Sequence, residues 1–214
     1  MPRANHSLLI AAVAILALPA CEKKATETAP TKPPEPAVAA DESAPLDVPP
    51  PVSTSTWTET RADFVNTLGQ PVGTVEFKDG LGGVLIRIDM RFLTPGWHGI
   101  HLHQVGDCSD GADGFKLSGG HINPDNKEHG LLNPNGSHRA DLPNLYADKN
   151  GDAKAEFFRA GLHLMPSEEA AAVNGPFPLL DDDGFAVIVH EDADDQMTQP
   201  IGGAGARVAC AALK

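Results

Sequence analysis

Imidazole side chains are concentrated in one part of this chain, at the spacing of a paired metal site. Six of its nine histidines, together with one aspartate, recur between residues 101 and 190. In chain order these seven residues are His101, His103, His121, His129, His138, Asp141 and His190. Imidazole nitrogens and carboxylate oxygens are ligands that copper and zinc accept in proteins. Binding of one or two transition-metal ions is therefore the first chemistry that the sequence indicates.

The first two of these histidines lie two residues apart in an apolar context. Residues i and i+2 of a strand point to the same face, so His101 and His103 project together while Ile100 and Leu102 point into the core. Two imidazoles on one rigid strand make half of a copper or zinc site. His98 shares the parity of the core-facing residues, and we expect it to be a buried structural histidine rather than a ligand.

The next four candidates form a closed set of a different kind. Three nitrogens and one oxygen, from His121, His129, His138 and Asp141, make the tetrahedral set that zinc accepts in structural sites. These residues follow one another along a single segment, so metal binding there would also fold that segment.

His190 ends an apolar run that begins at Phe185 and could complete the site begun by His101 and His103. That site would still have only three ligands, unless His121 loses its proton and binds both metals through its two ring nitrogens. The resulting four imidazoles would favour Cu(II). Histidines scattered over the surface are the alternative interpretation.

Strand patterns dominate the part of the chain that carries these residues. Residues 84–92 and 152–157 alternate between apolar and charged side chains, which predicts two half-buried strands, the first including Phe92 on its buried face. Asn150-Gly151 before the second strand is a strong tight-hairpin signal. We expect residues 72–77 to pair with 84–92 across Asp79-Gly80. The segments 185–190 and 207–213 are further short apolar strands, and the one helical signal is a turn at 166–169. The pattern indicates an all-β antiparallel sandwich or barrel.

One long segment, residues 105–140, has no sustained period and is rich in Gly, Asn, Asp and Pro. A structureless loop of that length needs something to order it. Three candidate metal ligands lie inside the segment, and Cys108 lies near its start. Cys108 and Cys210 are a natural disulfide pair in an oxidising compartment, worth roughly 4–5 kcal/mol on the chain-entropy model; two unpaired thiols are the alternative. We expect metal and disulfide together to order this loop.

The N-terminal region predicts export. Residues 1–21 read as an export signal, whose apolar run, Leu8 to Leu18, is too short to span a bilayer. It ends in Leu18-Pro19-Ala20-Cys21, which resembles a bacterial lipobox and predicts lipidation of Cys21; ordinary signal cleavage nearby is the alternative. Residues 22–56 contain eight prolines among 35 residues and predict a disordered linker, with or without a specific role as a tether.

Residues 57–214 have the length of one domain with a real core. They carry 12 Lys and Arg against 23 Asp and Glu, a formal charge of −11. This charge argues against nucleic acid and anionic lipid surfaces as partners of the domain. It would also repel an anionic substrate, so any chemistry on anions needs a local positive charge.

Several stretches of the domain resemble the copper-zinc superoxide dismutases of the bacterial periplasmic kind. They are Gly99–His103, Gly119–His121, His138–Pro143, His190–Asp195 and Gly203–Cys210, and the resemblance extends over nearly all of residues 57–214. It implies a Greek-key β-barrel and a disulfide between Cys108 and Cys210. It also implies copper at His101, His103, His121 and His190 and zinc at His121, His129, His138 and Asp141, with His121 as the bridge.

The resemblance also implies roles for two residues outside the ligand set. Asp194 matches a carboxylate that links a copper ligand to a zinc ligand, here His101 and His129. Arg207 matches an arginine that lines the copper channel and docks the superoxide anion; a surface arginine is the alternative. The implied reaction is ping-pong dismutation of superoxide to dioxygen and hydrogen peroxide, with copper as the redox centre.

The sequence departs from the family pattern in two places. The segment 196–201 is short and contains no lysine, so the charged guidance loop found in many members of the family is reduced here. The rate at which superoxide encounters the site is left open. Residues 161–184 form a long stretch with an additional histidine, His163, which we expect at the surface, and with a solvated turn at Asp181–Asp183.

Two other functions stay open: a periplasmic copper or zinc store without turnover, and a zinc-only structural domain. Homodimer and monomer are equally compatible with the sequence.

Overall fold

The computed structural model describes residues 57–166 and 175–214 of the 214-residue chain. The expected export signal, the lipidation site at Cys21, the linker and most of the expected helical turn at 166–169 lie outside these ranges. Among the described residues, no helix is long and apolar enough to cross a membrane.

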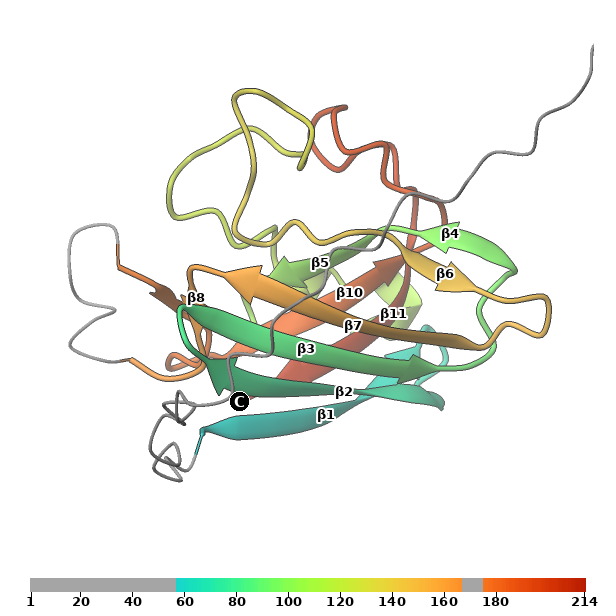
Figure 1. The fold of residues 1–214 in the computed structure, drawn as a ribbon. Helices are drawn as coiled ribbons and strands as arrows, with labels where there is room; N and C mark the ends of the chain where they lie inside the picture. The colour runs from blue at the N-terminus through green and yellow to red at the C-terminus, as the bar shows by residue number, and fades with distance from the viewer. Residues whose placement is uncertain (1–56, 167–174) are drawn as a thin grey trace, which may run out of the picture. The chain divides into compact units, whose positions relative to one another are not determined.

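The main element is a curled antiparallel sheet of seven strands (Figure 1). Its order is β5-β10-β11-β1-β2-β3-β7, and each strand is antiparallel to its neighbours. The strands are β1 (Glu59–Asn66), β2 (Pro71–Gly80), β3 (Gly83–Met90), β5 (Ile100–His103), β7 (Ala153–Ala160), β10 (Phe185–His190) and β11 (Arg207–Leu213). Two short pairs accompany them: β4 (Gly96–His98) with β6 (Leu145–Ala147), and β8 (Leu162–His163) with β9 (Phe177–Pro178).

The inner face of the curled sheet holds the core. Apolar side chains from β1, β2, β3, β5 and β10 are buried together there, and the rings of Phe77 and Phe185 meet edge to face at 5.0 Å. These rings come from β2 and β10, which are three places apart in the sheet order. Their contact shows that the sheet folds over on itself, as in a barrel. The all-β antiparallel barrel predicted from the sequence is confirmed.

The predicted strands are present, with three corrections. Asp79 and Gly80 end β2 and pair with Val84 and Gly83, so the turn to β3 lies at residues 81–82 and not at Asp79-Gly80. The first strand ends at Met90 rather than Phe92, because the backbone of Phe92 turns into the left-handed region (φ 66°) and leaves its ring 79% exposed. Gly151 does form a tight turn, in which its N–H bonds to the carbonyl of Asp148. That turn, however, joins β6 to β7, which pair with β4 and β3 and not with each other. A turn signal fixes the local reversal of the chain but not the partner of each strand.

The segment between β5 and β6 lacks regular strands, as expected, and contains only two single 3-10 turns, η1 (Gly111–Asp113) and η2 (Lys116–Ser118). The predicted disulfide between Cys108 and Cys210 ties the segment to β11, with the two Cα atoms 5.7 Å apart. Further along, the segment lies beside residues 191–206 above the ends of β5 and β10 (Figure 1). Hydrogen bonds join them, among them Leu132 N–H to the carbonyl of Gln196.

Candidate metal centre

Neighbouring strands and two backbone bridges bring the seven candidate ligands together. β10 pairs with β5 so that Ile188 faces His101, and His190 follows at the end of β10. Isolated bridges join His103 to His121 and His101 to Asp141, so the loop residues enter the site through main-chain contacts. All seven candidate residues are buried, with exposed fractions of 9% or less.

Hydrogen bonds to one nitrogen of each ring decide what the other nitrogen can do. His101 Nε2 donates to Asp194 Oδ2 (2.9 Å), His103 Nδ1 to the carbonyl of Gly119 (2.9 Å), and His190 Nδ1 to the carbonyl of Gly205 (3.2 Å). Carbonyl and carboxylate oxygens can only accept, so each of these nitrogens carries a proton. The opposite nitrogen of each neutral ring is then a lone pair.

Within this cluster, four ring nitrogens are left without a partner. His101 Nδ1, His103 Nε2, His121 Nε2 and His190 Nε2 are buried and make no hydrogen bond among the described residues. An unsatisfied buried polar atom costs about 1–3 kcal/mol, so four in one cluster need a physical reason. A cation bound among these nitrogens would satisfy all four. Three of the residues, His103, His121 and His190, also have donor atoms within 4.8 Å of one another.

A second set of lone pairs faces one another on the other side of His121. His138 Nε2 donates to the carbonyl of Lys127 and His129 Nε2 donates to Asp194 Oδ1, both at 3.0 Å, so both Nδ1 atoms are unprotonated in the neutral rings. Yet His138 Nδ1 lies 3.0 Å from His121 Nδ1, and His129 Nδ1 lies 2.9 Å from Asp141 Oδ1. Such pairs repel unless a proton or a metal ion lies between them.

The spacing of the second set suits zinc. Asp141 Oδ1 is 3.5 Å from His121 Nδ1 and 3.7 Å from His138 Nδ1. Tetrahedral zinc with bonds of 2.0–2.2 Å would hold its ligand atoms about 3.3–3.6 Å apart. Both distances lie close to that range, and the pairs at 3.0 and 2.9 Å are a few tenths shorter, so the donor set fits zinc after small side-chain adjustments.

Comparison with known proteins decides the family. Residues 72–213 match the family model described as copper/zinc superoxide dismutase (SODC). The copper-zinc superoxide dismutase of Caulobacter vibrioides is 42% identical over 147 residues, which are 68% of this chain and 80% of that protein. The chain belongs to the copper/zinc superoxide dismutase family.

Other relatives agree with this assignment. One copper-zinc superoxide dismutase of Aquifex aeolicus is 34% identical over 72% of this chain and 85% of its own length. Among solved structures, copper/zinc superoxide dismutase from Brucella abortus matches with a TM-score of 0.55 and 30% identity, over 73% of this chain and all of that one. A SOD-like protein from Bacillus subtilis matches with a TM-score of 0.65 and 36% identity, over 74% of this chain and 99% of that one.

Membership in the superoxide dismutase family agrees with the electrostatics of the histidine cluster. Burial lowers the pKa of His101 to about 4 and that of His190 to about 3, and it lowers the pKa of His103 well below its usual 6.5. Neighbouring positive groups, including Arg207, lower the last two further. These rings are therefore neutral at physiological pH, which is the form that binds a metal.

The surroundings of His129 have the opposite effect. Burial lowers its pKa, but hydrogen bonds to Asp141 and Asp194 outweigh burial and raise the pKa to about 9. Burial raises the pKa of both aspartates, and hydrogen bonds from histidines outweigh it, so both pKa values lie well below the usual range. This half of the centre therefore favours a bound cation.

Asp194 lies between the two halves of the centre. Its Oδ2 accepts from His101 and its Oδ1 accepts from His129 and from the Gln196 N–H. The loop packs closely on this carboxylate, because a Cβ at Gly202 would overlap Asp194 Oδ1. Gly202 also has a φ of +63°, which favours glycine.

Arg207 is half-buried at the start of β11, close to the first set of nitrogens. Its Nη1 donates to the Phe115 carbonyl (2.6 Å) and to Ser118 Oγ (3.1 Å), and its Nη2 donates to the Gly119 carbonyl (3.0 Å). A guanidinium has five N–H groups, so two have no partner among the described residues. The side chain is held firmly while part of it stays available to an anion.

The structure also places the histidines that we did not count as ligands. His98 is buried, and its two ring nitrogens lie 2.8 Å from the His190 carbonyl and 2.7 Å from the Thr94 carbonyl, in agreement with a structural role. His163 is half-buried on β8 rather than exposed, because β9 pairs alongside it. It does not join the seven-residue cluster.

Sequence reasoning missed the polar residues that hold the ligands. Asn144 binds the backbone of Asp194 through both ends of its amide, and Gln199 does the same for His129. Ser118, buried beside Arg207, was missed as well. For all three, the only signal is a position near a ligand stretch, because nothing in the sequence shows which backbone groups a polar side chain meets.

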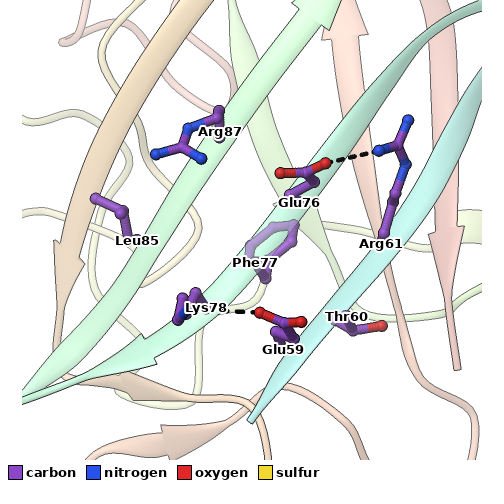
Figure 2. A pocket seen from close by; sticks show the side chains of 8 residues that line it. All are labelled: Glu59, Thr60, Arg61, Glu76, Phe77, Lys78, Leu85 and Arg87. Carbon is purple, nitrogen blue, oxygen red and sulfur yellow. Dashed lines mark hydrogen bonds and ion pairs between the residues drawn. The ribbon is translucent and has the colours of Figure 1, made fainter. Parts of the chain in front are cut away.

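One well-formed surface pocket lies away from this centre. It has a volume of about 460 Å³ and lies on the outer face of β1, β2 and β3 (Figure 2). Ion pairs cross it, Arg61 with Glu76 and Lys78 with Glu59. These paired charges are typical of a solvated sheet surface, and cavity size alone does not identify the functional site here.

Proposed function

We propose that this superoxide dismutase binds copper through His101, His103, His121 and His190 and zinc through His121, His129, His138 and Asp141. The observation that carries the proposal is the complementary pair of lone-pair clusters on the two sides of His121. One consists of four buried nitrogens without partners, and the other of nitrogen and oxygen atoms 2.9–3.7 Å apart that need a proton or a metal ion between them.

Two histidines, His101 and His138, are candidates for the remaining zinc ligand beside His121, His129 and Asp141. By distance alone, His101 groups with His121, His129 and Asp141 within 4.8 Å. However, His101 Nε2 is used by Asp194, and its Nδ1 is one of the four unpartnered nitrogens. His138 Nδ1, in contrast, lies 3.0 Å from His121 Nδ1 and 3.7 Å from Asp141 Oδ1, within a few tenths of an ångström of the spacing that zinc ligands need. Hydrogen bonding therefore favours His138 where proximity alone does not.

His121 would serve both ions. Its Nε2 belongs to the unpartnered cluster and its Nδ1 to the zinc set, so binding of both ions requires the ring to lose both protons. The reaction converts two superoxide ions and two protons into dioxygen and hydrogen peroxide in two alternating half-reactions. Copper, when bound, supplies the one-electron redox couple that zinc lacks. His121 Nε2 is then the atom of this chain that can hold a proton between the half-reactions, while Nδ1 keeps the ring in place.

Arg207 would dock the substrate. Its two N–H groups without partners can donate to superoxide, and its charge attracts an anion into a domain whose formal charge is −11. Residues 196–201 carry no lysine to extend this attraction outward. The positive field is therefore local, and we propose that capture depends mainly on Arg207.

A metal store without turnover is the second candidate. A "superoxide dismutase-like protein" of Bacillus subtilis is 39% identical over 70% of this chain, so this alternative needs a direct test. The decisive experiment combines copper and zinc analysis with a superoxide assay and a visible spectrum of the metal-loaded chain. One copper and one zinc per chain, a Cu(II) band and rapid superoxide consumption support the enzyme. Zinc alone, or copper without turnover, would overturn the proposal.

We also propose that the chain acts outside the cytoplasm. A disulfide between Cys108 and Cys210 suits an oxidising compartment, and residues 1–21 read as an export signal followed by a linker at 22–56 and the enzyme domain at 57–214. Lipidation of Cys21 would anchor the enzyme to a membrane. Mass spectrometry of the mature N-terminus tests this: a diacylated Cys21 supports the anchor, and an unmodified N-terminus elsewhere refutes it.

A further inference from the structure

A serine hydroxyl is buried between the docking arginine and a copper ligand. Ser118 ends η2, three residues before His121, and it is fully buried. Its Oγ lies 3.1 Å from Arg207 Nη1 and 3.3 Å from His103 Nδ1. It contacts both the group proposed to receive superoxide and a ring proposed to bind copper.

The hydrogen-bonding capacity of this hydroxyl is fully used. A serine hydroxyl has one donor and two acceptor lone pairs. Its O–H donates to the Phe115 carbonyl at 2.8 Å. Its lone pairs accept from Arg207 Nη1 and, as the longer branch of a shared bond, from His103 Nδ1–H, which donates mainly to the Gly119 carbonyl at 2.9 Å. Such a hydroxyl can take only one orientation, so it defines where the guanidinium lies.

The acceptors of Arg207 share one more property. They are two carbonyls and a hydroxyl, all of them neutral. A carboxylate in the position of the hydroxyl would hold the guanidinium equally well but would cancel the charge that attracts an anion. A neutral acceptor fixes the geometry and leaves the positive charge available.

We propose that Ser118 is a positioning residue that orients Arg207 for anion docking beside the copper site. This inference rests on the proposed function of Arg207. His103 keeps its bond to the Gly119 carbonyl when the hydroxyl is lost, so copper binding does not depend on Ser118. Nη1 keeps the Phe115 carbonyl and Nη2 keeps the Gly119 carbonyl, but one of three acceptors is lost, so the guanidinium is held less firmly.

The test uses Ser118→Ala in the metal-loaded chain, with azide as an anion probe followed at the visible Cu(II) band. We expect azide affinity and superoxide turnover each to fall by roughly 3- to 10-fold, the effect of one hydrogen bond, with copper and zinc content unchanged. Ser109→Ala is the matched control, because Ser109 is exposed on the same loop. It should bind azide like the wild type.

A double-mutant cycle separates positioning from a general structural effect. In an Arg207→Ala background, Ser118→Ala should change azide affinity less than 2-fold, because the group that it orients is absent. Equal losses in both backgrounds, unchanged affinity in the single variant, or loss of copper from Ser118→Ala would each overturn the inference. If the wild-type chain binds both metals without consuming superoxide, the proposed activity fails, and the azide cycle still measures the coupling of Ser118 to Arg207.

Discussion

At the scale of single residues, the hydrogen bond made by one ring nitrogen of each histidine determines whether the other nitrogen is free to bind a metal. His103 and His190 donate from Nδ1 to backbone carbonyls, whereas His101 donates from Nε2 to Asp194. The sequence predicted which histidines gather, because residue type and spacing carry that information. It could not predict which nitrogen of each ring stays free, since that depends on carbonyls and carboxylates that only the fold brings near.

His121 is the residue on which both metal sites depend. Replacement by alanine removes one nitrogen from each set of ligands, so we expect His121→Ala to lose most of its copper and to bind zinc at least 10-fold more weakly. Metal analysis of the purified variant, with a competitive zinc titration, measures both effects. His163→Ala is the control and should retain both metals, since His163 lies outside the cluster. A His121→Ala chain with either site intact would contradict the shared ligand.

Arg207 should affect turnover without affecting metal content. Its side chain donates only to Phe115, Ser118 and Gly119 and to no candidate ligand side chain. We expect Arg207→Ala to slow superoxide turnover by about 10- to 100-fold, the effect of losing charged hydrogen bonds to an anion. Turnover of Arg207→Lys should lie between that of the wild type and that of Arg207→Ala, because lysine keeps the charge but lacks the planar guanidinium. Full activity in Arg207→Ala would remove its proposed role.

At the scale of elements, rigid strands carry three of the ligands and a long loop carries the others. The sequence predicted that His101 and His103 share one face of a strand, because alternate residues of a strand point the same way. It also predicted β10, because a short apolar run is typical of a buried strand. The loop between β5 and β6 has no such period. Its shape depends on the disulfide, on the metal ligands and on contacts such as Gln199 with His129, none of which has a local signature.

Removal of zinc should therefore loosen this loop more than any strand. Without a cation, the close pairs His121–His138 and His129–Asp141 need protons to avoid repulsion, and their contribution to holding residues 121–141 together weakens. We expect hydrogen exchange and protease cleavage within residues 105–140 to rise at least 10-fold after chelation of zinc. β1, β2 and β3 serve as the internal control and should keep their protection. Equal protection of the loop with and without zinc would refute this account.

Hydrogen bonds between residues far apart in the sequence also hold the loop that carries the candidate zinc ligands. Arg159 on β7 donates to the carbonyls of His138 (2.8 Å) and Arg139 (3.1 Å), which fixes the end of the loop against the sheet. Arg139 in turn pairs with Asp125 and donates to the carbonyls of Gly161 and Gly175. The long stretch 161–184, which the sequence marked only as unusual, is thus connected to a ligand-bearing loop. Nothing in the sequence indicated these long-range pairs.

At the scale of the whole molecule, the buried histidines predict how the stability of the metal-free protein depends on pH. The pKa values of His101 and His190 are about 4 and about 3, below the usual 6.5. As the pH falls below 6.5, these rings take up protons in the unfolded chain before they do so in the folded one. Stability is therefore lost progressively from pH 6.5 through pH 4 and 3.

The pKa of His129, raised to about 9, has the opposite effect. Its contribution is fully present below pH 6.5 and is lost as the pH rises through 9. We expect the melting temperature of the metal-free domain to be highest near neutral pH and to fall by more than 5 °C between pH 7 and pH 4. Thermal unfolding followed by circular dichroism at several pH values measures this, and a flat profile over that range would contradict the assigned pKa values.

The disulfide has a consequence for when the enzyme becomes competent. Cys210 lies three residues after Arg207 on β11, and Cys108 lies near the start of the loop that carries Phe115, Ser118 and Gly119. A newly made chain with reduced thiols lacks the covalent link between the arginine and the groups that hold it. We expect such a chain to acquire its metals and yet capture superoxide poorly. Formation of the disulfide would then be required for full activity, which confines that activity to the compartment where the two thiols are oxidised.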